Sequence, residues 1–145
     1  MSFARITCIS LLVIAASNIA VAAPKPADPA RQSPWDLYVD ANEAYEMKQG
    51  LGDKVLFVDV RDPIEIMFTG FTDVVDINIP FKIADRSSWN DRKPVYAMKI
   101  NPEFEVSIAA ALEARGLSKD APVILMCRSG GTRGAPSAKQ LFGKG

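Results

Sequence analysis

The residues best suited to chemistry lie in one short segment, which reads Cys127-Arg128-Ser129-Gly130-Gly131-Thr132-Arg133-Gly134. A cysteine reacts as its thiolate, and nearby cations or a helix N-terminus lower the pKa of a thiol from about 8.5 to roughly 3.5–7.5. Arg128 and Arg133 supply two cations, and the glycines permit a turn whose backbone N–H groups point inward at an anion. The segment therefore predicts a reactive thiolate beside a site for an anionic substrate.

We expect Cys127 to be the catalytic residue and the loop after it to bind the substrate. The predicted substrate-binding residues are Arg128, Ser129, Gly130, Gly131, Thr132 and Arg133. The alternative is a buried structural cysteine, because free cysteine often packs as a small apolar residue. The flanking arginines, the glycines and the position of Cys127 at the end of a predicted strand favour the catalytic role.

The composition excludes several other kinds of site. The chain contains no histidine, so neither a Ser-His-Asp or Cys-His pair nor a histidine-based zinc or iron site can form. No stretch has the ligand spacing of a calcium loop. We therefore expect no metal and no cofactor. Basic and acidic residues are equal in number, 17 each, so we also expect no nucleic-acid partner.

The first 22 residues have the pattern of a secretory signal peptide. They contain Arg5, an apolar run from Ile6 to Ala16 and the small-residue motif Ala20-Val21-Ala22. The apolar run is short for a membrane span of about 20 residues, although an uncleaved anchor is the alternative. We expect cleavage after Ala22, a periplasmic or secreted protein, and no stable membrane insertion after cleavage.

Residues 23–34 are rich in proline and small residues, which predicts a flexible segment before one folded domain over residues 35–145. Within that domain, helix and strand patterns alternate. Strands are expected at 55–60, 74–79 and 121–126, and helices at 40–49, 63–68, 101–115 and 134–142. Strands separated by helices predict a central parallel sheet in a three-layer α/β fold.

The insert between the second strand and the third long helix has a less regular pattern. Residues 85–94 are polar and are expected to form a loop, and residues 95–100 a short strand or flap. Trp89 and Tyr96 lie in this insert. We expect these two rings to cover apolar core; lining the mouth of the pocket is the alternative.

Three charged residues follow the first predicted strand closely. Asp59 and Arg61 lie near its end, and we expect them to brace loops by ion pairing, with contact between Arg61 and the bound anion as the alternative. Glu65 stands three residues after Asp62, a capping-box spacing, so we expect it to cap a helix start; pairing with Arg61 is its alternative. All three are predicted to give structural support.

These motifs together resemble the rhodanese family. Its active loop commonly reads Cys-Arg-Ser-Gly-x-Arg after a buried strand, and its Asp-Val-Arg-x-x-x-Glu and Asn-Ile-Pro motifs are matched by Asp59-Val60-Arg61 with Glu65 and by Asn78-Ile79-Pro80. The resemblance covers about residues 36–142. It implies a rhodanese-like fold and a persulfide on Cys127. It also implies transfer of sulfane sulfur from a small anionic donor such as thiosulfate to a thiol or cyanide acceptor.

Three features depart from the family pattern. Gly70-Phe71-Thr72 stands where the family often has Gly-His-Ile. Arg133 comes one position late, with Thr132 in the expected place, so the loop is either six residues long or one residue longer. The chain ends at Gly145, 18 residues after Cys127, whereas the family normally continues with another strand and helix. The last departure predicts a C-terminally short domain whose sheet lacks its last strand.

Other functions stay open from the sequence. Five residues separate Cys127 from Arg133, the spacing found in phosphatases and arsenate reductases, although Met126 replaces the histidine usual in phosphatase loops. A non-enzymatic persulfide carrier or rhodanese-like binding module is another possibility. We favour a thiosulfate sulfurtransferase-like enzyme, because a nucleophile that is already ionised needs no general base, which fits a chain without histidine.

Overall fold

The computed structural model describes residues 23–144, so the predicted signal peptide, residues 1–22, lies outside the described residues. In chain order the elements are η1 (Pro29–Arg31), α1 (Ala41–Leu51), η2 (Gly52–Lys54), β1 (Leu56–Asp59), α2 (Pro63–Thr69), β2 (Ile77–Asn78), β3 (Lys82–Asn90), β4 (Val95–Ile100), α3 (Phe104–Ala114), β5 (Val123–Met126) and α4 (Gly134–Leu141). Among these residues no helix is long and apolar enough to cross a bilayer.

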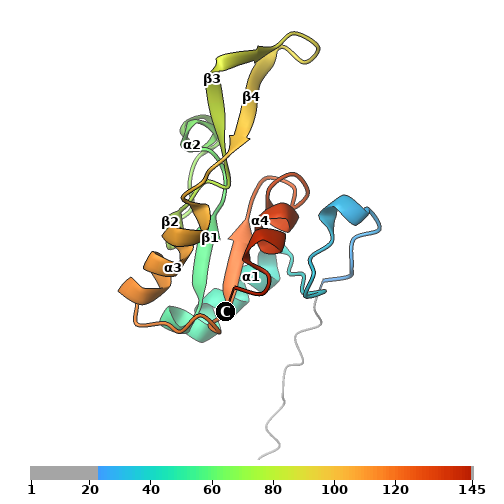
Figure 1. The fold of residues 1–145 in the computed structure, drawn as a ribbon. Helices are drawn as coiled ribbons and strands as arrows, with labels where there is room; N and C mark the ends of the chain where they lie inside the picture. The colour runs from blue at the N-terminus through green and yellow to red at the C-terminus, as the bar shows by residue number, and fades with distance from the viewer. Residues whose placement is uncertain (1–22, 145) are drawn as a thin grey trace, which may run out of the picture.

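A parallel sheet with the strand order β2-β1-β5 forms the centre of the fold (Figure 1). All four residues of the central strand β1 are buried, as expected of a strand covered on both faces. β1 and β5 run in register, with Leu56 opposite Val123 and Asp59 opposite Met126. The protein is thus a mixed α/β protein with helices flanking a parallel sheet, which is compatible with the predicted three-layer arrangement.

Two apolar cores lie on opposite faces of this sheet, because successive strand residues point to opposite sides. On one face, Leu56 and Val58 pack with Phe104 and Ile108 of α3. On the other face, Phe57 and Ile124 pack with Ala44 of α1 in a second core. The sheet is therefore held between α3 and α1, and its strand ends are fixed from both sides.

The predicted starts of α1, α2 and α4 are confirmed, whereas α3 begins at Phe104 instead of Asn101 and the predicted end of α1 is wrong. Asp40 accepts hydrogen bonds from the Asn42 and Glu43 N–H groups, and Glu43 accepts one from the Asp40 N–H, which completes the capping box. The sequence placed the end of α1 at Gln49 and Gly50. The helix continues through both to Leu51, and Gly52 closes it with a left-handed φ of 56°.

The loop predicted over residues 85–94 is also wrong, because β3 extends to Asn90 and pairs antiparallel with β4. This hairpin projects away from the sheet (Figure 1). Its polar residues are exposed to solvent, and they are compatible with strand structure because neither face of the hairpin has to be buried. Trp89 and Tyr96 face each other across it at 5.2 Å between ring centroids. They are 52% and 47% exposed and do not cover the core, contrary to our expectation.

The segment before α1 lies against the last helix and the cysteine loop. Residues 23–34, expected to be flexible, contain η1, whose start is capped by Asp28. The Trp35 ring meets the Phe142 ring edge-on at 5.0 Å. The Arg31 side chain crosses Gly131 so closely that a Cβ there would lie 3.2 Å from Arg31 Cγ. Gly131 is therefore a position of close approach between the segment and the loop.

Asp76 links α1, β1 and the end of α3 through a buried carboxylate. It accepts hydrogen bonds from the Phe57 N–H at 2.8 Å and from Lys48 Nζ at 2.9 Å, and it pairs with Arg115 at 3.2 Å. Burial by itself raises the pKa of Asp76. The bonds from Lys48 and Phe57 and the charge of Arg115 outweigh burial and hold this pKa below its ordinary value of 3.8.

Replacement of Asp76 by Asn should lower the free energy of unfolding by about 2 kcal/mol, because the Lys48 ammonium loses its buried acceptor charge. The lowered pKa means that the unfolded chain takes up the proton first, so the contribution of Asp76 is present above about pH 4 and is lost as the pH falls through the lowered pKa. Urea unfolding near neutral pH and in acid measures both effects. An Asp76→Asn variant with the wild-type pH dependence would contradict this account, and exposed Asp120→Asn is the control.

Candidate active site

The carboxyl ends of two neighbouring parallel strands bring the candidate residues together. The Val60 N–H donates to the Met126 carbonyl at 2.8 Å, so the exits of β1 and β5 are hydrogen-bonded to each other. Asp59 ends β1, Arg61 follows two residues later, and Cys127 is the first residue after β5. This is the edge at which ligands bind in open α/β sheets.

Cys127 leads from β5 into a tight loop and then into α4, as the sequence predicts. Gly130 has a φ of 72°, a conformation that favours glycine, and its N–H donates to Cys127 Sγ at 3.1 Å. The Gly130 carbonyl accepts from the Ala135 N–H at 2.9 Å, which ties the loop to the start of α4. The sulfur is half-buried and accepts a hydrogen bond that stabilises a negative charge on it.

Asp59 and Arg61 form the expected ion pair. The Asp59 carboxylate is 0% exposed, and it accepts from Arg61 Nε at 2.9 Å and from Arg61 Nη2 at 2.5 Å. The hydrogen bond to Asp59 is the main cause that raises the pKa of Arg61, with a smaller contribution from the charge of Cys127. Arg61 thus neutralises the buried carboxylate and lies close enough to Cys127 for their charges to interact.

Arg61 also connects the strand exit to the end of α2. Its Nη1 donates to Thr69 Oγ1 at 2.7 Å and its Nη2 to the Gly70 carbonyl at 3.1 Å. Together with the two bonds to Asp59, these contacts engage four of the five N–H groups that a guanidinium carries. The fifth, on Nη1, has no acceptor within residues 23–144, so it is available to an anion.

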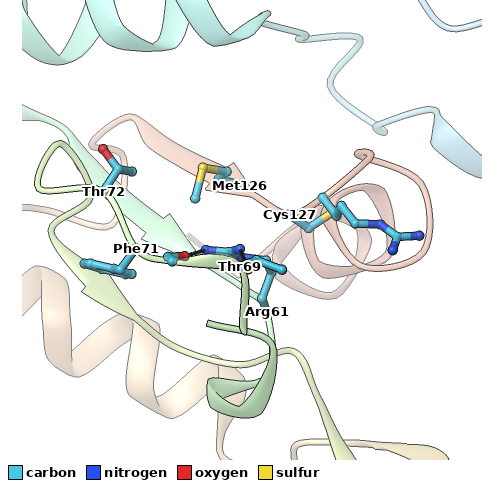
Figure 2. A pocket seen from close by; sticks show the side chains of 8 residues that line it. Arg61, Thr69, Phe71, Thr72, Met126 and Cys127 are labelled. Carbon is cyan, nitrogen blue, oxygen red and sulfur yellow. Dashed lines mark hydrogen bonds between the residues drawn. The ribbon is translucent and has the colours of Figure 1, made fainter. Parts of the chain in front are cut away.

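A small pocket of about 280 Å³ opens beside the sulfur (Figure 2). Two guanidinium groups, of Arg61 and Arg128, contribute to its lining, and no carboxylate does. The full set is Arg61, Thr69, Gly70, Phe71, Thr72, Met126, Cys127 and Arg128. Asp59 offsets the charge of Arg61, so the net positive charge of the pocket comes from Arg128, and both this charge and the free N–H of Arg61 favour a small anion.

The sequence did not predict the wall opposite the cysteine loop. Phe71 and Thr72 form part of it, and these are the residues that stand where the rhodanese family often has His-Ile. That departure was the one sequence signal for a pocket wall at this position. The other new contributor, Met126, follows from its place directly before Cys127 at the end of β5.

Glu65 and Arg133 have roles different from those predicted. Asp62 alone caps the start of α2, by accepting from the Ile64 N–H at 2.9 Å, while Glu65 Oε1 pairs with Arg133 Nη1 across the site. Neither the capping role of Glu65 nor its pairing with Arg61 is correct. The physical reason is a buried charge: Arg133 is only 8% exposed and requires an anionic partner.

Arg133 therefore holds the cysteine loop and does not line the pocket. Burial lowers the pKa of the Arg133 guanidinium. The negative charge of Asp59 raises this pKa, and the positive charge of Arg61 lowers it further. Arg133 Nε has no hydrogen-bond partner in the described part of the chain. Of the six loop residues predicted to bind substrate, Arg128 lines the pocket. Gly130 lines an adjoining apolar cavity, and neither cavity is lined by Ser129, Gly131, Thr132 or Arg133.

The hairpin rings do not contribute to the site, and the described residues form no metal site. Trp89 and Tyr96 line neither cavity, so their alternative role at the pocket mouth is also wrong. Across residues 23–144 no group of three or more potential ligand side chains is placed to hold a metal ion.

Comparisons of the chain with protein-family models, curated proteins and solved structures found no match.

Replacement of Glu65 by Ala should lower the free energy of unfolding by about 2 kcal/mol, because it leaves the buried Arg133 guanidinium without its acceptor. Glu65→Gln retains an acceptor oxygen, so this substitution should lower the free energy of unfolding by less than Glu65→Ala. Urea unfolding measures both. The control is Glu113→Ala, at an exposed position of α3 without an ion pair, for which a change within about 0.5 kcal/mol is expected. Equal effects of the two alanine substitutions would refute the bracing role.

Proposed function

We propose that the protein is an exported sulfurtransferase of the rhodanese type, in which Cys127 carries sulfane sulfur from an anionic donor to a thiol or cyanide. The observation that carries the proposal is the half-buried Cys127 thiol in a pocket with Arg61 and Arg128 and no carboxylate. The Gly130 N–H, which donates to Sγ, supports a thiolate in the resting state and a persulfide after transfer.

The meeting of three separate sequence motifs supports the same function. Asp59 and Arg61 lie beside Cys127, and Asn78 fixes the segment between them by donating from Nδ2 to the Asp59 and Arg61 carbonyls at 2.8 and 2.9 Å. The motifs that resemble the rhodanese family are therefore parts of one site rather than scattered matches. Each of them has a physical task there.

In the first half-reaction, the pocket arginines bind the sulfonate oxygens of thiosulfate and orient its outer sulfur toward Cys127. The thiolate attacks that sulfur, the S–S bond of thiosulfate breaks with both electrons passing to the sulfonate group, and sulfite leaves. Cys127 then holds a persulfide. In the second half-reaction an acceptor nucleophile takes the outer sulfur, and the electron pair of the broken S–S bond restores the Cys127 thiolate.

The position of Arg133 argues against phosphatase or arsenate reductase chemistry. Such a loop needs its closing arginine to bind a tetrahedral oxyanion through two parallel hydrogen bonds. Arg133 is instead buried and paired with Glu65. A non-enzymatic persulfide carrier would form the same adduct on Cys127 but would not turn over with cyanide, so turnover separates the carrier from the enzyme.

The decisive experiment treats the mature protein with thiosulfate and follows sulfite release, thiocyanate formation and the intact mass. We expect a gain of one sulfur atom on the peptide that contains Cys127. Cys127→Ser should fall to the uncatalysed rate and take up no sulfur, because a hydroxyl without a general base is a poor nucleophile. Exposed Ser118→Ala is the control. Thiosulfate turnover by the Cys127→Ser variant would remove the proposed mechanism.

Replacement of Arg128 by Ala should raise the KM for thiosulfate about tenfold and change kcat little, because it removes one charge-assisted contact to the donor. Arg128→Lys should retain part of the binding, since it keeps the charge and loses the planar donor pair. Steady-state kinetics at two ionic strengths measure this. Arg92→Ala, a charge change on the distant hairpin turn, should leave KM unchanged; equal effects of Arg92 and Arg128 would mean that only net charge matters.

A further inference from the structure

A second cavity, of about 390 Å³, adjoins the anion pocket on the α1 face of the sheet. Its walls come from residues 39–45, from β1 and β5, from the segment before β2 and from the cysteine loop. Nine of the thirteen lining residues are apolar or aromatic, among them Val39, Ala44, Tyr45, Phe57, Val74 and Ile124. The volume is in the range of pockets that bind small organic molecules.

The two cavities meet at the reactive sulfur. Thr72, Met126 and Cys127, which Figure 2 shows in the anion pocket, line both cavities, so a molecule in the second cavity has the Cys127 end of β5 beside it. Otherwise the linings differ in chemistry. Both guanidinium groups belong to the anion pocket, and no cation lines the second cavity.

The one charged group in the second lining is the Asp40 carboxylate. Its Oδ1 already accepts the Asn42 and Glu43 N–H groups as the cap of α1. An anionic donor is thus disfavoured in this cavity, both by apolar burial of its charge and by the Asp40 carboxylate. The chemistry of the walls fits a neutral, apolar molecule.

We infer that this second cavity, the acceptor cavity, binds the sulfur acceptor, and that the acceptor is a neutral thiol bearing an alkyl or aryl group. The inference rests on the proposed sulfur transfer and assigns the two substrates to two different cavities. In the reaction, the acceptor sulfur bonds to the outer sulfur of the Cys127 persulfide, and the persulfide S–S bond breaks. Cys127 leaves as a thiolate, and the proton of the acceptor thiol passes to the transferred sulfur, so the product is a neutral alkyl persulfide.

The test separates the two half-reactions. The mature protein is first loaded with thiosulfate and freed of donor, and loss of the added sulfur atom is then followed by mass spectrometry with ethanethiol, butanethiol, hexanethiol or cyanide. At low thiol concentration we expect the rate to rise about two- to fourfold for each added methylene, in proportion to apolar burial. Mercaptopropionate should react at least about tenfold more slowly than propanethiol, because its carboxylate would be buried.

Two variants and a matched control test whether the preference for longer thiols depends on the second cavity. Val39→Trp narrows it from a position that is 41% exposed, and Tyr45→Ala removes a wall at an exposed position of α1. Both should flatten the dependence on chain length, lower the hexanethiol rate about tenfold and leave the cyanide rate within twofold. Leu37→Trp, 72% exposed and outside the cavity, should behave like the wild type.

The possible failures are distinguishable. A wild-type protein that takes up no sulfur from thiosulfate contradicts the proposed function, and the inference with it. A protein that loads sulfur and passes it to cyanide, but reacts with all neutral thiols at rates independent of chain length, keeps the proposed function and overturns the assignment of the acceptor cavity. Equal effects of Val39→Trp and Leu37→Trp would also overturn it.

Discussion

The buried charge of Asp59 is the constraint on which the rest of the site depends. A carboxylate with no exposure needs a cation held against it, since an uncompensated buried charge costs several kcal/mol. Arg61 provides that cation, and the same guanidinium binds Thr69 and the Gly70 carbonyl. The end of β1 and the end of α2 are therefore fixed by one side chain. Its remaining N–H borders the pocket, so in the proposed reaction the group that stabilises Asp59 would also contact the bound anion.

A second buried pair fixes the opposite side of the pocket. Glu65 at the start of α2 pairs with Arg133, the residue directly before α4. This ion pair fixes the C-terminal end of the cysteine loop to α2, while β5 fixes its other end. The three arginines of the site thus differ in burial and not in type. Arg133 is enclosed, Arg61 is paired but borders the pocket, and Arg128 is exposed. Of the three, only Arg128 has an exposed side chain that could move with a bound anion in the proposed reaction.

The features that the sequence predicted correctly have local causes. Asp40 and Asp62 cap helices through bonds to the next few residues, and Cys127 leaves a strand whose apolar run is continuous. The errors have several different causes. Glu65 has a normal capping spacing, but its partner lies 68 residues away. The polar β3 residues were indistinguishable from a loop because a hairpin that projects into solvent needs no apolar alternation. The acceptor cavity is lined by four separate segments of the chain, and no single segment indicates it.

In the proposed sulfur transfer, two cavities of different polarity would let one sulfur serve substrates of opposite character. A donor such as thiosulfate is a dianion and leaves a second dianion, sulfite, so its half-reaction needs cations and access to water. An apolar thiol gains nothing from cations and is bound by removing its chain from water. A single pocket that met both demands would place arginines against apolar walls and desolvate them at a cost of several kcal/mol. At the end of β5, Met126 packs against the core on the α1 face and Cys127 against the core on the α3 face, and both side chains border both cavities. In the proposed reaction, donor and acceptor would therefore reach one sulfur from two cavities of different polarity.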